Sequence, residues 1–321
     1  MSVTLMDIEA AAGRLKGHSV VTPLIENPAL NALAGGRVLV KPESLQLVGA
    51  FKFRGAWNRL AQLSDAERKA GVVAFSSGNH AQGVALAAQR LGAPAIIVMP
   101  SDAPRIKIEN TRGYGAEVIF YDRAKDDRMA LARRILAERG GTLVPAFDDE
   151  AIIAGQGTIG LELLDQAGTL DVVVGPIGGG GLMSGVSTAI KARSPGTVIW
   201  GVEPEAFDDT RRSFEAGRRV EAPPGQRSLC DSLETAMPGE ITFPILQQNL
   251  AGVVTVSDAE VAEAMRFAFA NLKLVLEPGG AASLAAVLAG KVETRDRVSA
   301  VICTGGNVDP GLFARILAGE V

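Results

Sequence analysis

Histidine and cysteine are scarce in this sequence, with only two of each among its 321 residues. Zinc sites built on several histidines are excluded, because His18 and His80 are the whole supply. Cys230 and Cys303 lie far apart, so they provide neither the spacing of a metal site nor a disulfide framework. We therefore expect a cytoplasmic protein, the simplest setting for so little cysteine.

Long apolar runs and basic clusters are also absent. No stretch of 18 apolar residues exists, so we expect no membrane span. Residues 1–16 carry Asp7 and Glu9 and lack an apolar centre flanked by positive charge, which argues against a signal peptide. A net charge of −4 without a concentrated basic run argues against nucleic-acid binding.

The sequence does contain enough apolar residues, 47%, for a substantial core, and its length allows two domains or one large α/β unit. Short β-branched runs alternate with longer amphipathic ones along the whole chain. Residues 96–98 and 172–174 are apolar on both faces, as in strands buried within a parallel sheet. The strands are too numerous for one compact sheet, so we expect an α/β fold with two mainly parallel sheets.

The alternation predicts the elements one by one. Strands are expected at residues 37–41, 71–75, 95–99, 116–120, 142–144, 171–174, 197–202, 253–256 and 298–302. Helices are expected at residues 5–15, 55–63, 80–91, 104–112, 126–139, 151–166, 180–193, 209–217, 258–272, 280–288 and 310–317.

Lys52 stands between two phenylalanines, Phe51 and Phe53. Apolar neighbours disfavour the charged form of an amine and lower its pKa. A neutral amine is the nucleophile that Schiff-base chemistry needs. The segment alone also fits a lysine that only extends along an amphipathic helix, so both interpretations stay open.

Four consecutive glycines, residues 178–181, follow the strand expected at 171–174. Because glycines carry no side chains, their N–H groups can converge on a phosphate at a helix N-terminus. A dinucleotide fingerprint is excluded, since Met183 and Ser184 stand where it requires a glycine. A small phosphate is the better interpretation, and a loop shortened for close helix–strand packing is the alternative.

Polar residues follow two other expected strands. Residues 76–80 combine two hydroxyls, an amide and helix N-terminal N–H groups, which suits a carboxylate but also an ordinary N-cap. Thr304 follows the strand expected at 298–302. Ligands in such folds bind at the carboxyl ends of the strands. A lysine, a phosphate loop and polar groups at these ends together indicate a pyridoxal phosphate pocket.

Together these motifs resemble the fold type II pyridoxal-phosphate enzymes, specifically the serine/threonine dehydratase and serine racemase group. The resemblance covers the whole chain through FKFRGA (51–56), SSGNH (76–80), GQGT (155–158), GGGG (178–181), EP (203–204), EP (277–278) and GGN (305–307). It implies a tryptophan synthase β-like fold of two three-layer α/β/α domains, with the cofactor between them and a homodimer as the usual state. The large cofactor-binding domain would take residues 1–45 and 148–321, and the small substrate-binding domain residues 46–147.

The resemblance also implies roles at the cofactor. Lys52 would hold the cofactor through its amine and later exchange the α-proton of the substrate. Thr304 would face the pyridine nitrogen, where a neutral hydroxyl favours β-elimination over transamination. The other residues implied there are Phe51 near the ring, Asn79 at the 3′-hydroxyl, Glu277, and Gly178, Gly179, Gly180, Gly181 and Leu182 at the phosphate.

Further roles concern the substrate and a metal ion. The residues implied at the substrate are Ser76, Ser77, Gly78, Asn79, His80 and Arg128. Ser77 matches the acid/base on the opposite face in racemases of the group. Glu203, the carbonyl of Phe207 and Asp209 match a site for Mg²⁺, or for Ca²⁺ or Mn²⁺, which suits a hard cation that keeps several waters. Two exposed acids beside a helix N-terminus are the alternative.

The activity implied is a dehydratase, or ammonia-lyase, that converts small 3-hydroxy amino acids to 2-keto acids and ammonia, with L-threonine and L-serine as the default substrates. A serine or amino-acid racemase using Ser77 stays open. So does a 3-hydroxyaspartate dehydratase giving oxaloacetate, which needs a further cation such as Arg128 for the distal carboxylate. A non-catalytic binder of the cofactor would leave Lys52 and Ser77 without a purpose. The chain ends soon after the last motif, so we expect no C-terminal regulatory domain.

Overall fold

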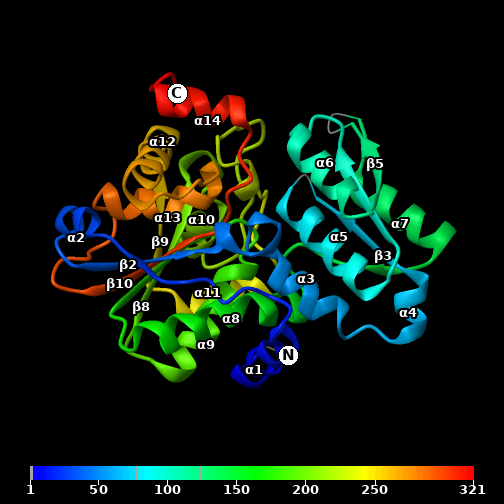
Figure 1. Cartoon of the computed structure of the whole chain (residues 1–321), viewed down its shortest axis with the longest axis horizontal. Helices are drawn as coiled ribbons and strands as arrows, with labels where there is room; N and C mark the ends of the chain where they lie inside the picture. The colour runs from blue at the N-terminus through cyan, green and yellow to red at the C-terminus, as the bar shows by residue number, and fades with distance from the viewer. Residues whose placement is uncertain (1–2, 77, 123–124) are drawn as a thin grey trace.

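Two β-sheets organise the protein (Figure 1). The computed structural model describes residues 3–76, 78–122 and 125–321. The larger sheet contains, in spatial order, β1 (Ile25–Glu26), β2 (Arg37–Pro42), β10 (Val298–Cys303), β7 (Val172–Pro176), β8 (Val198–Pro204) and β9 (Gly252–Val256). The smaller sheet contains β5 (Glu117–Tyr121), β4 (Ala95–Pro100), β3 (Val72–Phe75) and β6 (Thr142–Leu143). All of these neighbours pair in parallel except β1 with β2, so the expected α/β fold is confirmed.

Helices cover both faces of each sheet. One face of the larger sheet carries α8 (Glu150–Ala167), α9 (Gly181–Arg193), α10 (Asp209–Ala216) and α11 (Thr242–Asn249), and α1 (Leu5–Leu15) packs on α8. The other face carries α2 (Pro28–Ala34), α12 (Asp258–Phe267), α13 (Pro278–Leu288) and α14 (Pro310–Ala318). The smaller sheet lies between α3 (Lys52–Leu60), α5 (Asn79–Leu91) and α6 (Arg105–Gly113) on one face and α7 (Arg128–Arg139) on the other. α4 (Asp65–Ala70) precedes β3.

The apolar run of β7 is typical of a strand in the centre of a sheet. Val172 and Val174 belong to the core on one face of the larger sheet, and Val173 belongs to the core on the other. All three are fully buried. A strand covered on both sides needs apolar residues at every position, which removes the alternation of a half-exposed strand.

Some predicted boundaries are wrong. The helix expected from residue 55 begins at Lys52, because Phe51 already has helical dihedrals and its carbonyl accepts a hydrogen bond from Arg54 at 3.0 Å. The helix expected at 258–272 ends as α12 at Phe267 and continues as a π turn (Ala268–Leu272), which Lys273 closes with φ +60°. Helices α2, α4 and α11 were not expected.

The four strands of the smaller sheet fall within residues 46–147, and the six of the larger sheet fall outside that range. The division into two domains at these residues stays a prediction. In the described part of the chain, none of the helices combines the length and the apolar character that a membrane crossing needs.

Candidate active site

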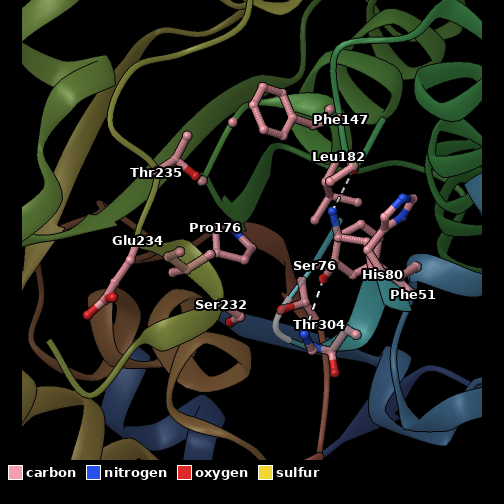
Figure 2. Close-up of a pocket in the computed structure, with 18 of the residues that line it drawn as sticks. Phe51, Ser76, His80, Phe147, Pro176, Leu182, Ser232, Glu234, Thr235 and Thr304 are labelled. Atoms are coloured by element: carbon pink, nitrogen blue, oxygen red, sulfur yellow. Dashed lines mark hydrogen bonds between the residues drawn. The ribbon is translucent and has the colours of Figure 1, made fainter. Parts of the chain in front are cut away.

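A cavity opens where elements of the two sheets meet, and most of the predicted cofactor and substrate residues line it. Figure 2 shows Ser76 and His80 on one side of this cavity and Glu234 and Thr235 on the other. The predicted residues that line it are Phe51, Lys52, Ser76, Gly78, Asn79, His80, Gly178, Gly179, Gly180, Gly181, Leu182 and Thr304. Segments that are far apart in the sequence are therefore brought together as the motifs predict.

Lys52 is the first residue of α3, and its side chain extends into this cavity. Its Nζ donates a hydrogen bond to the carbonyl oxygen of Ala146 at 2.7 Å and lies 5.2 Å from the centre of the Phe51 ring. Burial lowers the pKa of the Lys52 amine to about 8. Near neutral pH this lysine is thus much closer to its nucleophilic form than an exposed lysine.

Backbone pairing fixes the position of Lys52 relative to the loop after β10. The N–H of Phe51 donates to the carbonyl oxygen of Thr304 at 3.1 Å, and Ala50 forms a β-bridge with Gly305. Thr304 is buried at the end of β10 and lines the cavity. This short stretch of β-like pairing therefore fixes the positions of Lys52 and Thr304 relative to each other. Both are residues that the resemblance places at the cofactor ring.

The glycine loop joins β7 to α9, whose first helical residue is Gly181. The first N–H groups of a helix have no partner within it, so this end can bind an anion. Gly180 has φ +92°, which favours glycine. A Cβ on Gly179 would stand 2.3 Å from the ring of Phe147, which the sequence analysis did not single out. Close packing thus accounts for Gly179, and phosphate binding by the loop stays a prediction.

The junction between β3 and α5 presents polar groups to the cavity. The hydroxyl oxygen of Ser76 accepts a hydrogen bond from the N–H of Gly78 at 3.1 Å. His80 places Nε2 3.0 Å from the carbonyl oxygen of Val144, so Nε2 carries the proton. Burial, together with the neighbouring Lys52, lowers the pKa of His80 to about 3. His80 is therefore neutral, and it offers Nδ1 as an acceptor.

Behind Asn79 lies a group of three charged residues, two of them buried, of which only Glu277 was predicted from the sequence. Glu277 accepts a hydrogen bond from the amide nitrogen of Asn79, and it does not line the cavity itself. Lys107, on α6, lies against Glu277 and Asp231. Lys107 was missed because a buried lysine and an exposed one look alike in a helix that also carries Arg105 and Glu109.

The predicted metal ligands lie together, outside the cavity, where β8 leads into α10. Glu203 accepts hydrogen bonds from the N–H groups of Thr210 and Arg211, both at 2.9 Å, and Asp209 is the first residue of α10. Neither acid is exposed, so the alternative of two exposed acids is wrong, although Glu203 does cap the helix.

The chemistry of this acid pair suits a hard cation. Burial raises the pKa of Glu203 to about 7, and burial with the charge of Glu203 raises the pKa of Asp209 to about 9. Asp209 Oδ2 is buried and finds no hydrogen-bond partner among the described residues. A cation there would satisfy this oxygen and offset the two charges. Phe207 lies in the turn between the two acids. No group of three or more His, Cys, Asp or Glu in the described part of the chain is placed to hold a metal.

Two predicted substrate residues cannot be placed in this cavity. Ser77 lies outside the described residues. Arg128 is the first residue of α7, and its side chain lies outside the part of the chain that the structure describes. Their roles stay predictions.

Comparison with known proteins finds similar enzymes over nearly the whole chain. A family model described as "Pyridoxal-phosphate dependent enzyme" matches residues 15–304. The chain is 46% identical over 315 residues to the L-threo-3-hydroxyaspartate ammonia-lyase of Pseudomonas sp, with 98% of each chain covered. It superimposes on the crystal structure of the threonine deaminase of T.th. with a TM-score of 0.90 at 46% identity, covering 95% of this chain and 99% of that one. On maize serine racemase the TM-score is 0.94 at 35% identity, covering 100% and 98%.

Proposed function

The chain belongs to the family of pyridoxal-phosphate dependent enzymes, and from this premise we propose that it is a lyase that converts L-threonine and L-serine to 2-keto acids and ammonia. The similarity of the chain to enzymes named as ammonia-lyases supports the proposed release of ammonia. The relatives differ in their substrates, so the choice of amino acid depends on the cavity.

The charges around the cavity favour a substrate with an uncharged side chain, and this observation carries the choice. Lys107 is the one cation besides Lys52 among the described lining residues, and Asp231 and Glu277 already pair with it. Asp231 and Glu234 add negative charge to the same wall. A second carboxylate on the substrate would meet these acids with no unpaired cation other than Lys52 among the described lining residues, which opposes its binding.

The bound cofactor would supply the electron sink for the bonds at the substrate's Cα. The N–H groups of the glycine loop would hold its phosphate, and Asn79 would donate to its 3′-oxygen. Lys52 would hold the cofactor through its amine and would take up the α-proton of the substrate, for which a pKa of about 8 gives a usable neutral fraction. Ser76 and the N-terminus of α5 would hold the substrate carboxylate.

The test is a panel of L-threonine, L-serine, D-serine and the stereoisomers of 3-hydroxyaspartate with the cofactor and Mg²⁺ present. We expect kcat/KM for L-threonine or L-serine to exceed that for any 3-hydroxyaspartate isomer by at least roughly tenfold. Keto acid, ammonia and enantiomer ratio would be followed together. A reversed preference would contradict the proposed substrates and leave the lyase assignment in place.

A 3-hydroxyaspartate ammonia-lyase is the second candidate, favoured by the Pseudomonas relative of that name. It requires a cation for the distal carboxylate, and Arg128 is the residue predicted for that contact. This candidate would be established by a preference for one hydroxyaspartate isomer that Arg128→Ala abolishes while the turnover of L-serine is retained. Loss of enantiomeric purity faster than keto acid forms would instead indicate a racemase with Ser77 as the second base.

We further propose that Glu203, Asp209 and the Phe207 carbonyl bind Mg²⁺. Removing the cation with EDTA leaves two buried acids side by side, so we expect the unfolding temperature to fall by several degrees, about 2–4 °C for each kcal/mol lost. Re-adding Mg²⁺ should restore it. Asp209→Asn should make the unfolding temperature insensitive to EDTA, and indifference of the unmodified protein with no metal in elemental analysis would remove the site.

Three broader expectations remain predictions. The resemblance supports the homodimer and the division into domains of residues 1–45 with 148–321 and of residues 46–147, and the low cysteine content supports the cytoplasmic setting. A sedimentation measurement of the purified protein would test the first of them.

A further inference from the structure

Lys107 takes part in an ion triad that connects the two sheets, in which Lys107 and Glu277 are buried and Asp231 is partly exposed. It lies on α6, which packs beside the smaller sheet. Its Nζ stands 2.9 Å from Asp231 Oδ2 and 3.3 Å from Glu277 Oε2. Asp231 begins a short 3₁₀ turn, and Glu277 directly precedes α13, which packs on the larger sheet. The three side chains therefore tie α6 to the larger sheet.

The triad also separates two cavities. Lys107 and Asp231 line the candidate active site, and together with Glu277 they line a second cavity that extends to α14. Lys107 and Glu277 are buried, so neither can exchange its ionic partner for water. Burial of a charge is tolerated only where an opposite charge lies close.

Hydrogen bonds lead from the triad to a residue of the cofactor site. Glu277 Oε1 accepts from the amide nitrogen of Asn79, and Asn79 Oδ1 accepts from the amide nitrogen of Asn307 at 2.8 Å. The same nitrogen of Asn307 donates to the carbonyl oxygen of Val48 at 2.8 Å. This chain fixes which end of the Asn79 amide is the donor, and one proton of its nitrogen is left for a further acceptor.

A glycine makes room for this arrangement. A Cβ on Gly305 would stand 2.2 Å from Glu277 Oε1 and 3.2 Å from the amide nitrogen of Asn79. The carboxylate and the amide therefore lie directly against the backbone of the loop after β10. That loop also carries Thr304, which lines the same cavity.

We propose that Lys107 is a positioning residue for the cofactor: its charge keeps Glu277 a carboxylate, and Glu277 in turn holds the Asn79 amide with its nitrogen available to the cofactor's 3′-oxygen. The inference rests on the cofactor assignment and adds to it a residue that touches neither cofactor nor substrate in this role. The same ion triad links α6 to the larger sheet, so this link and the donor in the cofactor site share one side chain.

The physical reason is the cost of an unpaired buried acid. Burial raises the pKa of the Glu277 carboxyl, and the attraction of Lys107 opposes this rise. Without Lys107 the carboxyl takes up a proton and becomes a donor as well as an acceptor. It then no longer selects the nitrogen of the Asn79 amide, whose orientation is left to the single hydrogen bond from Asn307.

The test is a double-mutant cycle on cofactor affinity. Full-length unmodified protein, Lys107→Met, Glu277→Gln and the double variant would be stripped of cofactor and titrated with pyridoxal phosphate, with absorbance as the signal. We expect Lys107→Met to weaken binding roughly tenfold. In the Glu277→Gln background, where no charge needs a counterion, the same change should weaken it less than about twofold. The exposed Lys69→Met, on α4, is the matched control and should leave affinity unchanged.

A merely structural role would give a different result. It would lower the unfolding temperature of the stripped protein equally in both backgrounds and leave the cofactor affinity of the folded fraction unchanged, which would overturn the proposal. Should Lys107→Met fail to fold, Lys107→Gln takes its place, because it keeps a polar side chain beside the two carboxylates and removes only the charge. The same roughly tenfold loss of affinity is expected, and unchanged affinity would overturn the proposal. Failure of the unmodified protein to bind pyridoxal phosphate would instead contradict the cofactor assignment.

Discussion

Replacing Lys52 by alanine is expected to lower kcat by at least about a thousandfold, because the variant loses both the amine that holds the cofactor and the base that takes the α-proton. The fold should survive, since the side chain makes one hydrogen bond, to the carbonyl of Ala146. Turnover of L-serine and the far-ultraviolet circular dichroism spectrum would be measured together. The exposed Lys69→Ala is the control for a lost lysine on the same part of the chain.

A covalent readout separates chemistry from folding. Borohydride treatment of the unmodified protein should leave the reduced cofactor on the peptide that contains Lys52, and the variant should show no such peptide. A Lys52→Ala protein that still turned over substrate would remove Lys52 from the mechanism. A Lys52→Ala protein whose circular dichroism showed that it was unfolded would not test the role of Lys52. Lys52→Met, which keeps most of the side-chain volume, would then replace the alanine variant.

The same residue gives a pH signature in the cofactor-free protein. Burial lowers the pKa of Lys52 from 10.5 to about 8, so the folded state releases its proton before the unfolded state does. Between these two pH values the unfolded chain binds more protons, and the free energy of unfolding should rise with pH. The total rise is on the order of 3 kcal/mol, at 1.36 kcal/mol per pKa unit. Lys52→Met should be more stable at pH 7 and should lack this rise in urea unfolding between pH 8 and 10.5.

Local patterns predicted most of the fold, because the strands are buried on both faces and the turns carry glycine and proline. The helix at Leu5–Leu15 was placed at its observed ends, where Thr4 and Asp7 form a capping box. Helix α4 carries the same signal in Ser64 and Glu67, but its six residues include no buried side chain and so give no apolar stripe. A short helix without an apolar face escapes a search that starts from hydrophobic periodicity.

Residues of the site were predictable where they belong to a contiguous motif and not where they meet only in space. Lys52, Asn79 and the glycine loop each occupy a recognisable segment. Phe147 and Lys107 do not, since a phenylalanine before two aspartates and a lysine in a charged helix are ordinary features of an exposed surface. Only the packing of Phe147 on Gly179, and of Lys107 against two acids, gives them a part in the site.

Arg54 is the residue for which the sequence motif and the structure suggest the largest loss of stability. It lies two positions after Lys52 and is completely buried. Its guanidinium donates to both oxygens of Glu43, at 2.7 and 2.8 Å, and to both oxygens of Glu162, at 2.6 and 3.0 Å. Lys41 donates to Glu162 at 2.6 Å, so two cations and two acids balance. The network joins α3, which begins at Lys52, to β2 and α8.

Replacing Arg54 by methionine should therefore lower the free energy of unfolding by about 3–5 kcal/mol, because it leaves the buried Glu43 without its main counterion. Arg59→Met is the matched control on the same helix. Its pair with Asp149 is partly exposed, so its loss should cost less than about 1 kcal/mol. Chemical denaturation of the cofactor-free proteins would measure both, and equal losses would show that the network contributes no more than a surface ion pair. Glu43→Gln added to Arg54→Met should recover part of the stability, since no acid would then be left unpaired at that position. Arg54 does not line the cavity, so the activity lost in its variant should follow the fraction of unfolded protein, whereas that of Lys52→Ala should not.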